Sequence, residues 1–397
     1  MKREDFPMLD NNLIYFDNGA TTFKPKPVLE AICEYYTDYT ANAHRGDYDI
    51  SLKVDNKYEG ARELARKLIN ANSTSEIVFT SGTTDSLNKI IFGFFKNVLK
   101  KSDEILLTKS EHASNILPWF ELVDELGLKV NYIELNENLE VTMDSVKKAI
   151  TSNTKVISLA HITNVAGDVR PIKEITKLAR EKGIYVLIDG AQSVSHLPVD
   201  VIDLDVDFLT FSAHKMLGPT GVGVIYGKEE LLEKTHPIIF GGGMNASFNY
   251  DGTREYKFLP FRLEAGTPNI AGVIGMGAAI EYLLDIGMKN IHEYEYELKK
   301  YFISKLETIP EIIIYNKNTK SGIVTFNYED IFSQDLAIYL NKFNVCVRAG
   351  NHCARMLKDE LGIKNTCRAS FYFYNTKEEI DNVIDLLKKP NIKDEII

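Results

Sequence analysis

Chemically useful side chains occur in this sequence at the points where apolar runs end. The run 206–211 gives way to Ser212-Ala-His-Lys215 before a second apolar run begins at Val222. A lysine between two buried strands is unfavourable unless it is paired, neutral or covalently occupied. Burial favours the neutral amine, which can form a Schiff base with a carbonyl compound. The alternative is a lysine that follows the surface and keeps its ammonium in water, which is the commoner arrangement for a single lysine.

A turn and a carboxylate follow two other apolar runs. The turn Gly82-Thr83-Thr84 comes after the strand-like run 76–80 and opens a helical pattern. Its backbone N–H groups and the helix dipole suit a phosphate, although a simple Ser/Thr cap explains the same residues. Asp189 ends the apolar run 184–188. A carboxylate there needs a cation or several donors, and the alternative is a helix N-cap.

Three further polar residues, His112, Asn164 and Gln192, also follow strand-like runs. Taken singly, such residues are more often ordinary hydrogen-bonded or turn residues. Taken with Asp189 and Lys215, they fit a ligand that has a phosphate, a cationic ring nitrogen, an aromatic face and an aldehyde. Pyridoxal 5′-phosphate has these four features, and proteins bind it through a Schiff-base lysine and a carboxylate at the pyridinium nitrogen. The sequence therefore predicts a pyridoxal 5′-phosphate site.

The elements that would position these residues follow a regular order. Short β-rich runs alternate with helical patterns from about residue 76 to 227, which predicts an α/β fold with a mostly parallel sheet covered by helices. In such sheets the functional side chains gather beyond the carboxyl ends of the strands. After about residue 266 the pattern changes to long helices and a compact α+β unit. We expect a large domain, 15–283, and a small α+β domain formed by 1–14 and 284–397.

The composition argues against several classes of function. The chain has 397 residues, a net charge of −10 and a pI near 5.4, which disfavours nucleic acid or an anionic membrane as the main partner. No apolar run approaches the roughly 18 residues of a membrane span, and the first residues, MKREDFPMLDNN, do not resemble a signal peptide. The four cysteines form no CxxC pair. We therefore expect a cytoplasmic protein with reduced thiols and no metal site.

Seven segments that contain most of these residues carry a wider pattern. They are Phe16-Asp-Asn-Gly-Ala-Thr-Thr22, Asn42-Ala-His-Arg-Gly46, Ser110-Glu-His-Ala-Ser-Asn115, Asp189-Gly-Ala-Gln192, Ser212-Ala-His-Lys215, Glu264-Ala-Gly-Thr-Pro-Asn269 and Arg348-Ala-Gly-Asn-His-Cys353. In order and spacing they resemble the class V aminotransferase superfamily and, within it, the SufS-like (group II) cysteine desulfurase and selenocysteine lyase family. The resemblance covers nearly the whole chain. It implies a homodimer of fold type I that converts L-cysteine to L-alanine with pyridoxal 5′-phosphate and passes the sulfur on as a cysteine persulfide.

The resemblance also implies roles for individual residues. Lys215 would be the Schiff-base lysine, Asp189 the partner of the pyridine nitrogen, and His112 the side chain that stacks on the ring. Arg368 would bind the substrate carboxylate, and Thr267 would reach the phosphate of the neighbouring subunit. The implied cofactor residues are Thr83, Thr84, His112, Asn164, Asp189, Gln192, Ser212, His214, Lys215 and Thr267, and the implied substrate residues are Arg368, Asn164, His44 and Arg348.

The resemblance makes Cys353 the candidate for the thiolate that attacks the substrate's sulfur. Cys353 lies in a polar loop beside His352, with Arg348 and Arg355 near in sequence. Cations in such a setting would lower the pKa of a thiol. The other thiols are expected to be structural, with Cys33 in the core face of a helix and with Cys346 and Cys367 in strands.

Several functions stay open at this stage. A selenocysteine lyase, a cysteine sulfinate desulfinase and a class V aminotransferase share the same cofactor chemistry, but only sulfur transfer requires Cys353. A non-catalytic scaffold is disfavoured because Lys215, Asp189, Arg368 and Cys353 occur together. For a desulfurase the resemblance implies a SufE- or SufU-like sulfur-acceptor protein as partner, for example in iron–sulfur cluster assembly.

Overall fold

A large sheet is the scaffold for the predicted site residues. The computed structural model describes residues 2–390 and 392–395. Neighbouring strands of this sheet are parallel except where β8 pairs with β2 and β7, so the prediction of a mostly parallel α/β sheet is confirmed. The order of its seven strands is β2 (Ile77–Thr80), β8 (Gly223–Gly227), β7 (Phe208–Ser212), β6 (Tyr185–Asp189), β5 (Thr154–Ala160), β3 (Glu104–Leu107) and β4 (Lys129–Tyr132).

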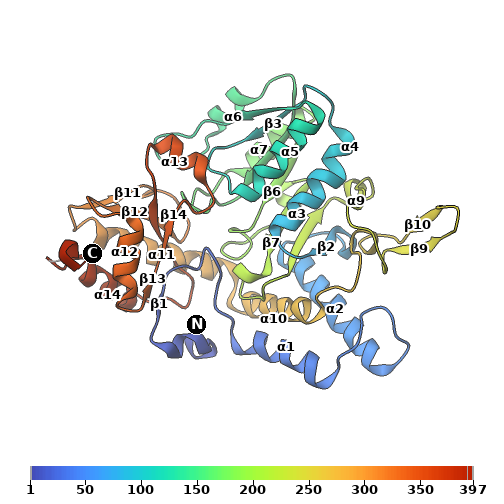
Figure 1. Cartoon of the computed structure of the whole chain (residues 1–397), viewed down its shortest axis with the longest axis horizontal. Helices are drawn as coiled ribbons and strands as arrows, with labels where there is room; N and C mark the ends of the chain where they lie inside the picture. Colours follow the sequence, from blue (N-terminus) through green and yellow to red (C-terminus); the bar gives the residue numbers. More distant parts are fainter. Residues whose placement is uncertain (1, 391, 396–397) are drawn as a thin grey trace.

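Both faces of the large sheet are apolar. Successive side chains of a strand point to opposite faces, so a continuous apolar run such as that of β6 supplies apolar side chains to both. In β6, Val186 and Ile188 join one core cluster, whereas Leu187 joins the cluster on the other face, with Phe94 and Trp119. Helices cover the sheet on both sides (Figure 1). Those of this part of the chain are α1 (Lys26–Asp38), α2 (Asp49–Leu68), α3 (Thr83–Ile90), α4 (Lys96–Val98), α5 (Leu117–Leu126), α6 (Met143–Ala149), α7 (Ile172–Glu181), α8 (Val201–Leu204), α9 (Glu229–Leu232) and α10 (Ile270–Ile286).

Strand β8 brings two distant turns together. Its Gly223 is paired with Thr80 of β2 on one side and with Ser212 of β7 on the other. A Cβ atom at Gly223 would lie 2.5 Å from the Cα atom of Gly82, so no larger residue fits without displacing the turn that opens α3. The turn after β2 and the end of β7 therefore lie close together at the same edge of the sheet, because the residue between them is a glycine with no side chain.

The rest of the chain forms a second unit around its own sheet. The order is β11 (Ile312–Ile314), β12 (Ile323–Tyr328), β15 (Thr366–Ser370) and β14 (Arg348–Gly350), all antiparallel, and β1 (Ile14–Tyr15) pairs with β13 (Val345–Cys346) beside it. Its core cluster includes Phe16, which lies within the predicted large domain. The predicted boundary at 283/284 falls near the end of α10. Its helices are α11 (Met288–Leu306), α12 (Ser333–Asn341), α13 (Arg355–Leu361), α14 (Lys377–Leu387) and α15 (Ile392–Glu395).

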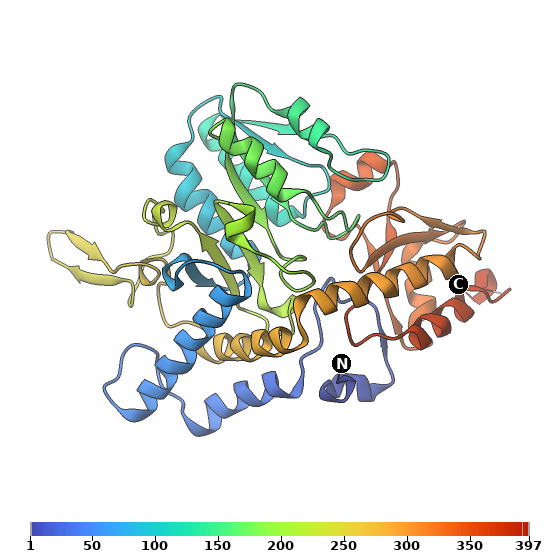
Figure 2. The same ribbon diagram turned by 180° about the vertical axis from the view of Figure 1, so that it is seen from behind.

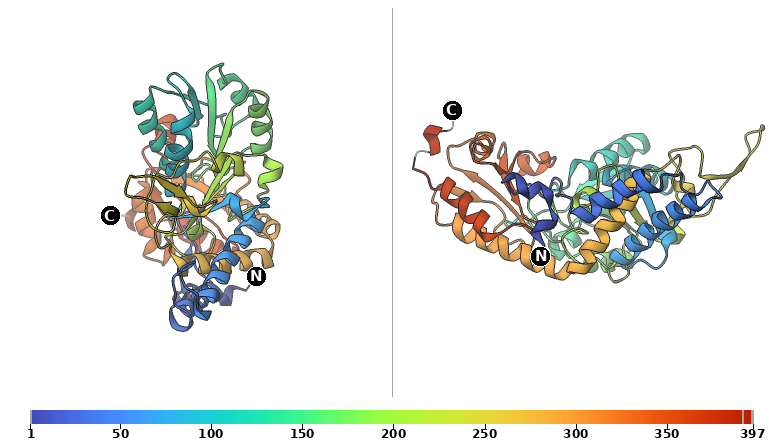
Figure 3. Two further views of the ribbon diagram at one scale, coloured as in Figure 1. Left: turned by 90° about the vertical axis from the view of Figure 1, so that its right-hand side faces the viewer. Right: turned by 90° about the horizontal axis from the view of Figure 1, so that it is seen from below.

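Helices α10 and α11 connect the two units along one side of the molecule (Figure 2). Within the described part of the chain, no single helix is both long and apolar enough to cross a membrane; α10 and α11 meet the two conditions only together, as a pair bent by 76°. At the opposite end from the small unit, the hairpin of β9 (Asn245–Phe248) and β10 (Arg254–Tyr256) projects from the body (Figure 3).

Candidate active site

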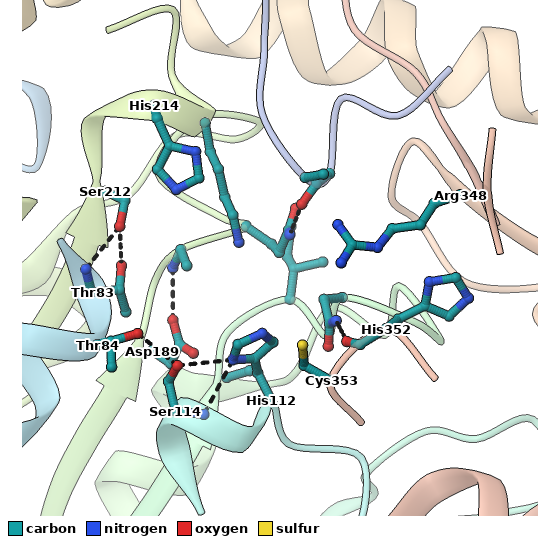
Figure 4. Close-up of a pocket in the computed structure, with 18 of the residues that line it drawn as sticks. Thr83, Thr84, His112, Ser114, Asp189, Ser212, His214, Arg348, His352 and Cys353 are labelled. Atoms are coloured by element: carbon teal, nitrogen blue, oxygen red, sulfur yellow. Dashed lines mark hydrogen bonds between the residues drawn. The ribbon is translucent and has the colours of Figure 1, made fainter. Parts of the chain in front are cut away.

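One cavity of about 220 Å³ lies at the carboxyl ends of β2, β5, β6 and β7 and reaches β14 and β15 of the small unit (Figure 4). The structure thus brings together residues that are up to 349 positions apart in sequence, from Gly19 to Arg368. Most of the predicted site residues line this one cavity, namely Thr83, Thr84, His112, Asn164, Asp189, Gln192, Ser212, His214, Lys215, Arg348, Cys353 and Arg368.

The end of the cavity where the sequence predicts a phosphate is built on the N-terminus of α3. The backbone N–H of Thr83 donates to Ser212 Oγ at 2.8 Å, and the Thr83 hydroxyl lies 2.8 Å from the same oxygen. The hydroxyl of Thr84 lies 2.7 Å from Ser114 Oγ. Two hydroxyl pairs at a helix N-terminus provide donors for an anion, and His214 lines the cavity beside them.

Burial shifts the pKa values of Asp189 and Lys215 in opposite directions. Burial raises the pKa of Asp189 to about 6, against the Ala191 N–H that donates to it and the charge of Lys215. Burial lowers the pKa of Lys215 to about 8, against the charge of Asp189 and with the help of Arg368. Near neutral pH a fraction of Lys215 is therefore a neutral amine, the form that reacts with carbonyl groups.

His112 presents a neutral ring to the cavity. Burial, together with the charges of Lys215, Arg348 and Arg368, lowers the pKa of His112 to about 4. Its Nδ1 accepts the backbone N–H of Ser114 at 3.2 Å, which fixes the ring at the start of the turn. A neutral imidazole held in this way can lie against a bound aromatic ring.

Two amide side chains leave buried oxygens free in the cavity. Asn164 Oδ1 and Gln192 Oε1 accept no hydrogen bond from any residue that the structure describes, although Asn164 donates to His352 O at 2.6 Å and Gln192 donates to Gly19 O at 2.8 Å. Buried polar atoms normally have partners. Free acceptors, a buried carboxylate and a partly neutral lysine around one cavity fit pyridoxal 5′-phosphate.

Arg368 is oriented from two sides. It is 2% exposed, and its Nη1 donates to Asn164 O while its Nη2 donates to Asp17 Oδ1, both at 2.9 Å. Gly19 allows this position, because a Cβ atom there would lie 3.2 Å from the guanidinium carbon. The Nε of Arg368 has no partner among the described residues, so the guanidinium retains donors for a carboxylate.

Cys353 is the exposed thiol of the cavity. It follows His352, and both residues have left-handed backbone angles, with φ 55° and 50°. The carbonyl of Cys353 accepts the Ala113 N–H at 2.8 Å, which ties the loop to the segment that carries His112. In Figure 4 the sulfur of Cys353 lies beside the ring of His112, while the ring of His352 is turned away.

His352, which precedes Cys353, does not bring a positive charge to the thiol. His352 is buried and its Nε2 lies 3.0 Å from the backbone oxygen of Thr366. Burial and the charges of Arg368 and Lys358 lower the pKa of His352 to about 2. The ring is therefore neutral, and Arg348, which lines the cavity, is the cation that faces this loop.

The other thiols lie outside the cavity. Cys367 is buried in β15, where burial raises its pKa to about 12 and its Sγ contacts Ser333 O at 3.1 Å. Cys346 is half-buried in β13, and burial raises its pKa. The prediction for Cys33 is wrong, because Cys33 is exposed. In α1 the buried residues are Val28 and Tyr35, and Cys33 lies five positions after Val28, which places it on a different face of the helix.

Two predicted residues lie away from the cavity of this chain. Thr267 is exposed. His44 is exposed as well, and its Nε2 lies 3.1 Å from Glu59 Oε1 on α2. His44 therefore does not line the mouth of the site within one chain, and the role of Thr267 stays a prediction about a second subunit.

Two residues that contribute to the site were not singled out from the sequence. Ser114 bonds both His112 and Thr84, and Asp17 bonds Arg368. Both occur inside segments that carry the family resemblance, which was the available signal. Their partners could not be inferred, because Asp17 and Arg368 are 351 positions apart.

The sequence profile of the aminotransferase class-V family matches residues 14–383, and the chain belongs to this family. Within it the chain is similar to proteins named cysteine desulfurase. It is 43% identical, over 97% of its length and 96% of the relative's, to a probable cysteine desulfurase of Halalkalibacterium halodurans.

Solved structures give the same relationship. The apo cysteine desulfurase of Thermococcus onnurineus NA1 has a TM-score of 0.93 at 38% identity, over 97% of this chain and 96% of that one. The cysteine desulfurase CsdA of Escherichia coli, solved as an S-sulfonic acid, has a TM-score of 0.93 at 34% identity, over 100% of this chain and 98% of that one. The predicted family and fold are confirmed.

Proposed function

We propose that this protein is a pyridoxal 5′-phosphate-dependent cysteine desulfurase that converts L-cysteine to L-alanine and takes up the sulfur on Cys353. The observation that carries the proposal is the single cavity around Lys215, Asp189, Arg368 and the exposed Cys353. The family and the similarity to proteins named cysteine desulfurase support it.

The residues of the cavity divide the work of holding the cofactor. When bound, pyridoxal 5′-phosphate withdraws electrons from the bonds at the substrate's Cα. Asp189, buried and in need of a cation, would hold a proton on the ring nitrogen. Thr83, Ser212 and His214 would hold the cofactor's phosphate, and His112 would lie against its ring. Lys215, with its pKa lowered to about 8, takes the proton from the substrate's Cα.

The substrate is held by its carboxylate and loses its sulfur to Cys353. Arg368 donates to the carboxylate, which directs the side chain of cysteine toward the Cys353 loop. The Cys353 thiolate attacks the substrate's sulfur, so that an S–S bond forms while the Cβ–S bond breaks. The electron pair of the broken bond stays on Cβ, which takes up the proton that the Cys353 thiol lost and becomes the methyl group of alanine. Lys215 returns its proton to Cα. Atoms and electrons balance without an external oxidant, and a persulfide remains on Cys353.

The remaining parts of the proposal concern partners. We include a homodimer in which Thr267 contributes to the neighbouring cofactor site, since Thr267 is exposed in the single chain. The sulfur acceptor is a SufE- or SufU-like protein, which meets the persulfide at the open mouth of the cavity. The cytoplasmic location stays a prediction from composition.

The test is a product assay with the purified holoenzyme. With L-cysteine and a thiol reductant, we expect alanine and sulfide in equal amounts over many turnovers. Without reductant, we expect about one alanine per active site, because the persulfide blocks further transfer. Selenocysteine and cysteine sulfinate are compared in the same assay. Turnover of cysteine sulfinate alone would identify a desulfinase, and turnover of selenocysteine alone a selenocysteine lyase. Formation of a keto acid would identify an aminotransferase.

A further inference from the structure

The backbone next to Lys215 is held by a segment 190 positions away in sequence. The carbonyl oxygen of His214 accepts the N–H of Thr22 at 3.1 Å, and it also accepts the hydroxyls of Thr21 at 3.0 Å and Thr22 at 3.2 Å. The ammonium of Lys24 is a fourth donor, at 3.3 Å. A carbonyl oxygen has only two lone pairs, so these donors share it and confine it closely.

The same segment holds the backbone on the other side of Lys215. Leu217 is buried and has a left-handed φ of 66°, a conformation that is unfavourable for a residue with a branched side chain and that persists only when its surroundings enforce it. The N–H of Leu217 donates to Thr22 Oγ1 at 2.9 Å. Lys215 therefore lies in a strained turn that is tied down both before and after it.

Lys24 completes this arrangement with a charge. Its Nζ donates to Thr21 Oγ1 at 3.2 Å, to the carbonyl of Thr22 and to the carbonyl of His214, so all three N–H groups of the ammonium are used. The described residues provide Lys24 with no carboxylate partner, and burial lowers its pKa to about 8. A half-buried cation bonded only to neutral oxygens is unfavourable by itself, which indicates a role beyond stability.

The backbone of residues 21–24 is held in place without the Lys24 ammonium. Phe23 stacks on Tyr15 and Tyr374, with ring centroids 4.3 Å and 5.6 Å away, and its N–H donates to the Tyr374 hydroxyl at 3.0 Å. Removing the charge of Lys24 should therefore leave residues 21–24 in place. The effect of such a change should be confined to the His214 carbonyl and the turn after it.

We propose that Lys24 is a positioning residue for Lys215, because its ammonium fixes the His214 carbonyl and thereby the place from which Lys215 reaches cofactor and substrate. The identity of that cofactor and substrate rests on the proposed function. The hydrogen bonds that fix the turn do not rest on the proposed function, since they are present in the chain without cofactor or substrate.

The first measurement is hydrogen exchange of the peptide around Leu217 in the cofactor-free protein. Lys24→Met keeps most of the side-chain stem and removes one of the four donors to the His214 carbonyl. The turn 214–217 should then open more easily, so that exchange at Leu217 becomes about fivefold faster although its own bond to Thr22 Oγ1 remains. Lys24→Arg should restore most of the protection. Lys26→Met, at the exposed first position of α1, is the matched control and should match the wild type.

The second measurement uses the holoenzyme. In Lys24→Met we expect kcat for L-cysteine to fall roughly tenfold with KM changed by less than about twofold, and the pH midpoint of the visible absorbance of the lysine-linked cofactor to move. Thr21→Ala removes another donor to the His214 carbonyl, so its effect on kcat should be non-additive with that of Lys24→Met. It serves as a second variant if Lys24→Met folds poorly. Unchanged exchange and an unchanged absorbance midpoint in Lys24→Met would overturn the proposal, even if its melting temperature falls. An absence of desulfurase activity in the wild type would instead overturn the proposed function.

Discussion

At the scale of single residues, we expect the charge of Arg368 to hold the substrate carboxylate. Arg368→Ala removes the donors for the substrate carboxylate, and a hydrogen bond to a charged group contributes about 1.5–3 kcal/mol. We expect the affinity for L-cysteine to fall roughly 10- to 150-fold, measured as KM or by titrating the spectral change on cysteine addition. The resting variant should still hold the cofactor on Lys215 and show its visible band, because the side-chain bonds of Arg368 go to Asn164 O and Asp17 Oδ1 and not to the residues at the N-terminus of α3. An unchanged affinity would mean that another group holds the carboxylate.

The carboxyl of Asp189 gives a second residue-scale prediction, on stability. Burial raises the pKa of Asp189 from its ordinary 3.8 to about 6. Between these values the folded protein binds more protons than the unfolded chain, so the free energy of unfolding of the cofactor-free protein should fall as pH rises through this window. Relative to Asp189→Asn, the loss between pH 4 and pH 6 should be about 2 kcal/mol, measured by urea unfolding at these two pH values.

Asp124→Asn, at an exposed position of α5, is the control for this measurement and should follow the wild-type pH dependence. If Asp189→Asn loses the same stability as the wild type between pH 4 and pH 6, the carboxyl is not desolvated in the way the structure indicates.

Residue types at strand ends could be read from the sequence, but their surroundings could not. Lys215 and Asp189 were found because a charge at the end of an apolar run is conspicuous. The neutral state of His352 could not be inferred from the sequence, since nothing near it in sequence shows that Thr366 and two cations surround its ring. The bond of Asp17 to Arg368 was missed for the same reason, because it joins distant parts of the chain.

At the scale of elements, the prediction concerns the contact between β8 and the turn that opens α3. In Gly223→Ala the new methyl group would lie 2.5 Å from the backbone of Gly82, so the turn with Thr83 must move. Overpacking of this kind costs about 1–3 kcal/mol of stability. We also expect weaker binding of pyridoxal 5′-phosphate, measured by fluorescence titration of the cofactor-free protein.

Gly60→Ala is the matched control for this element. Gly60 lies in α2 with no atom near its missing Cβ, and alanine favours a helix over glycine by about 1 kcal/mol. It should therefore be neutral or slightly stabilising, with unchanged cofactor affinity. Equal cofactor affinity in Gly223→Ala and the wild type would contradict the role assigned to this contact.

The order of elements was predictable because each strand and helix has its own hydrophobic period. The run Tyr185–Asp189 is an example, since its apolar residues pack on both faces of the sheet as expected of a parallel strand. The exposure of Cys33 was not predictable from the helical pattern alone, because α1 buries only Val28 and Tyr35. Which face of a helix is covered depends on neighbours that the local pattern does not specify.

At the scale of the whole molecule, we expect a homodimer with shared sites. Thr267 lies just after Gly266, which has a left-handed φ of 88°, and it is exposed at some distance in sequence from the cavity residues of its own chain. A C₂ dimer would repeat any contact of Thr267 with the partner's phosphate reciprocally. Light scattering should give a dimer, and Thr267→Ala should bind pyridoxal 5′-phosphate more weakly. A fully active monomer saturated with cofactor would contradict this expectation.

The central claim is that the sulfur of L-cysteine moves to Cys353. Mass spectrometry of the reacted holoenzyme, before and after digestion to peptides, tests it most directly. After L-cysteine is added without reductant, the wild type and Cys346→Ser should gain the mass of one sulfur atom on the peptide that contains Cys353, and a reductant should remove it. Cys353→Ser should bind the cofactor and L-cysteine, as judged by its visible spectrum, and gain no sulfur. Sulfur on another cysteine, or alanine and sulfide released by Cys353→Ser at the wild-type rate, would contradict the account.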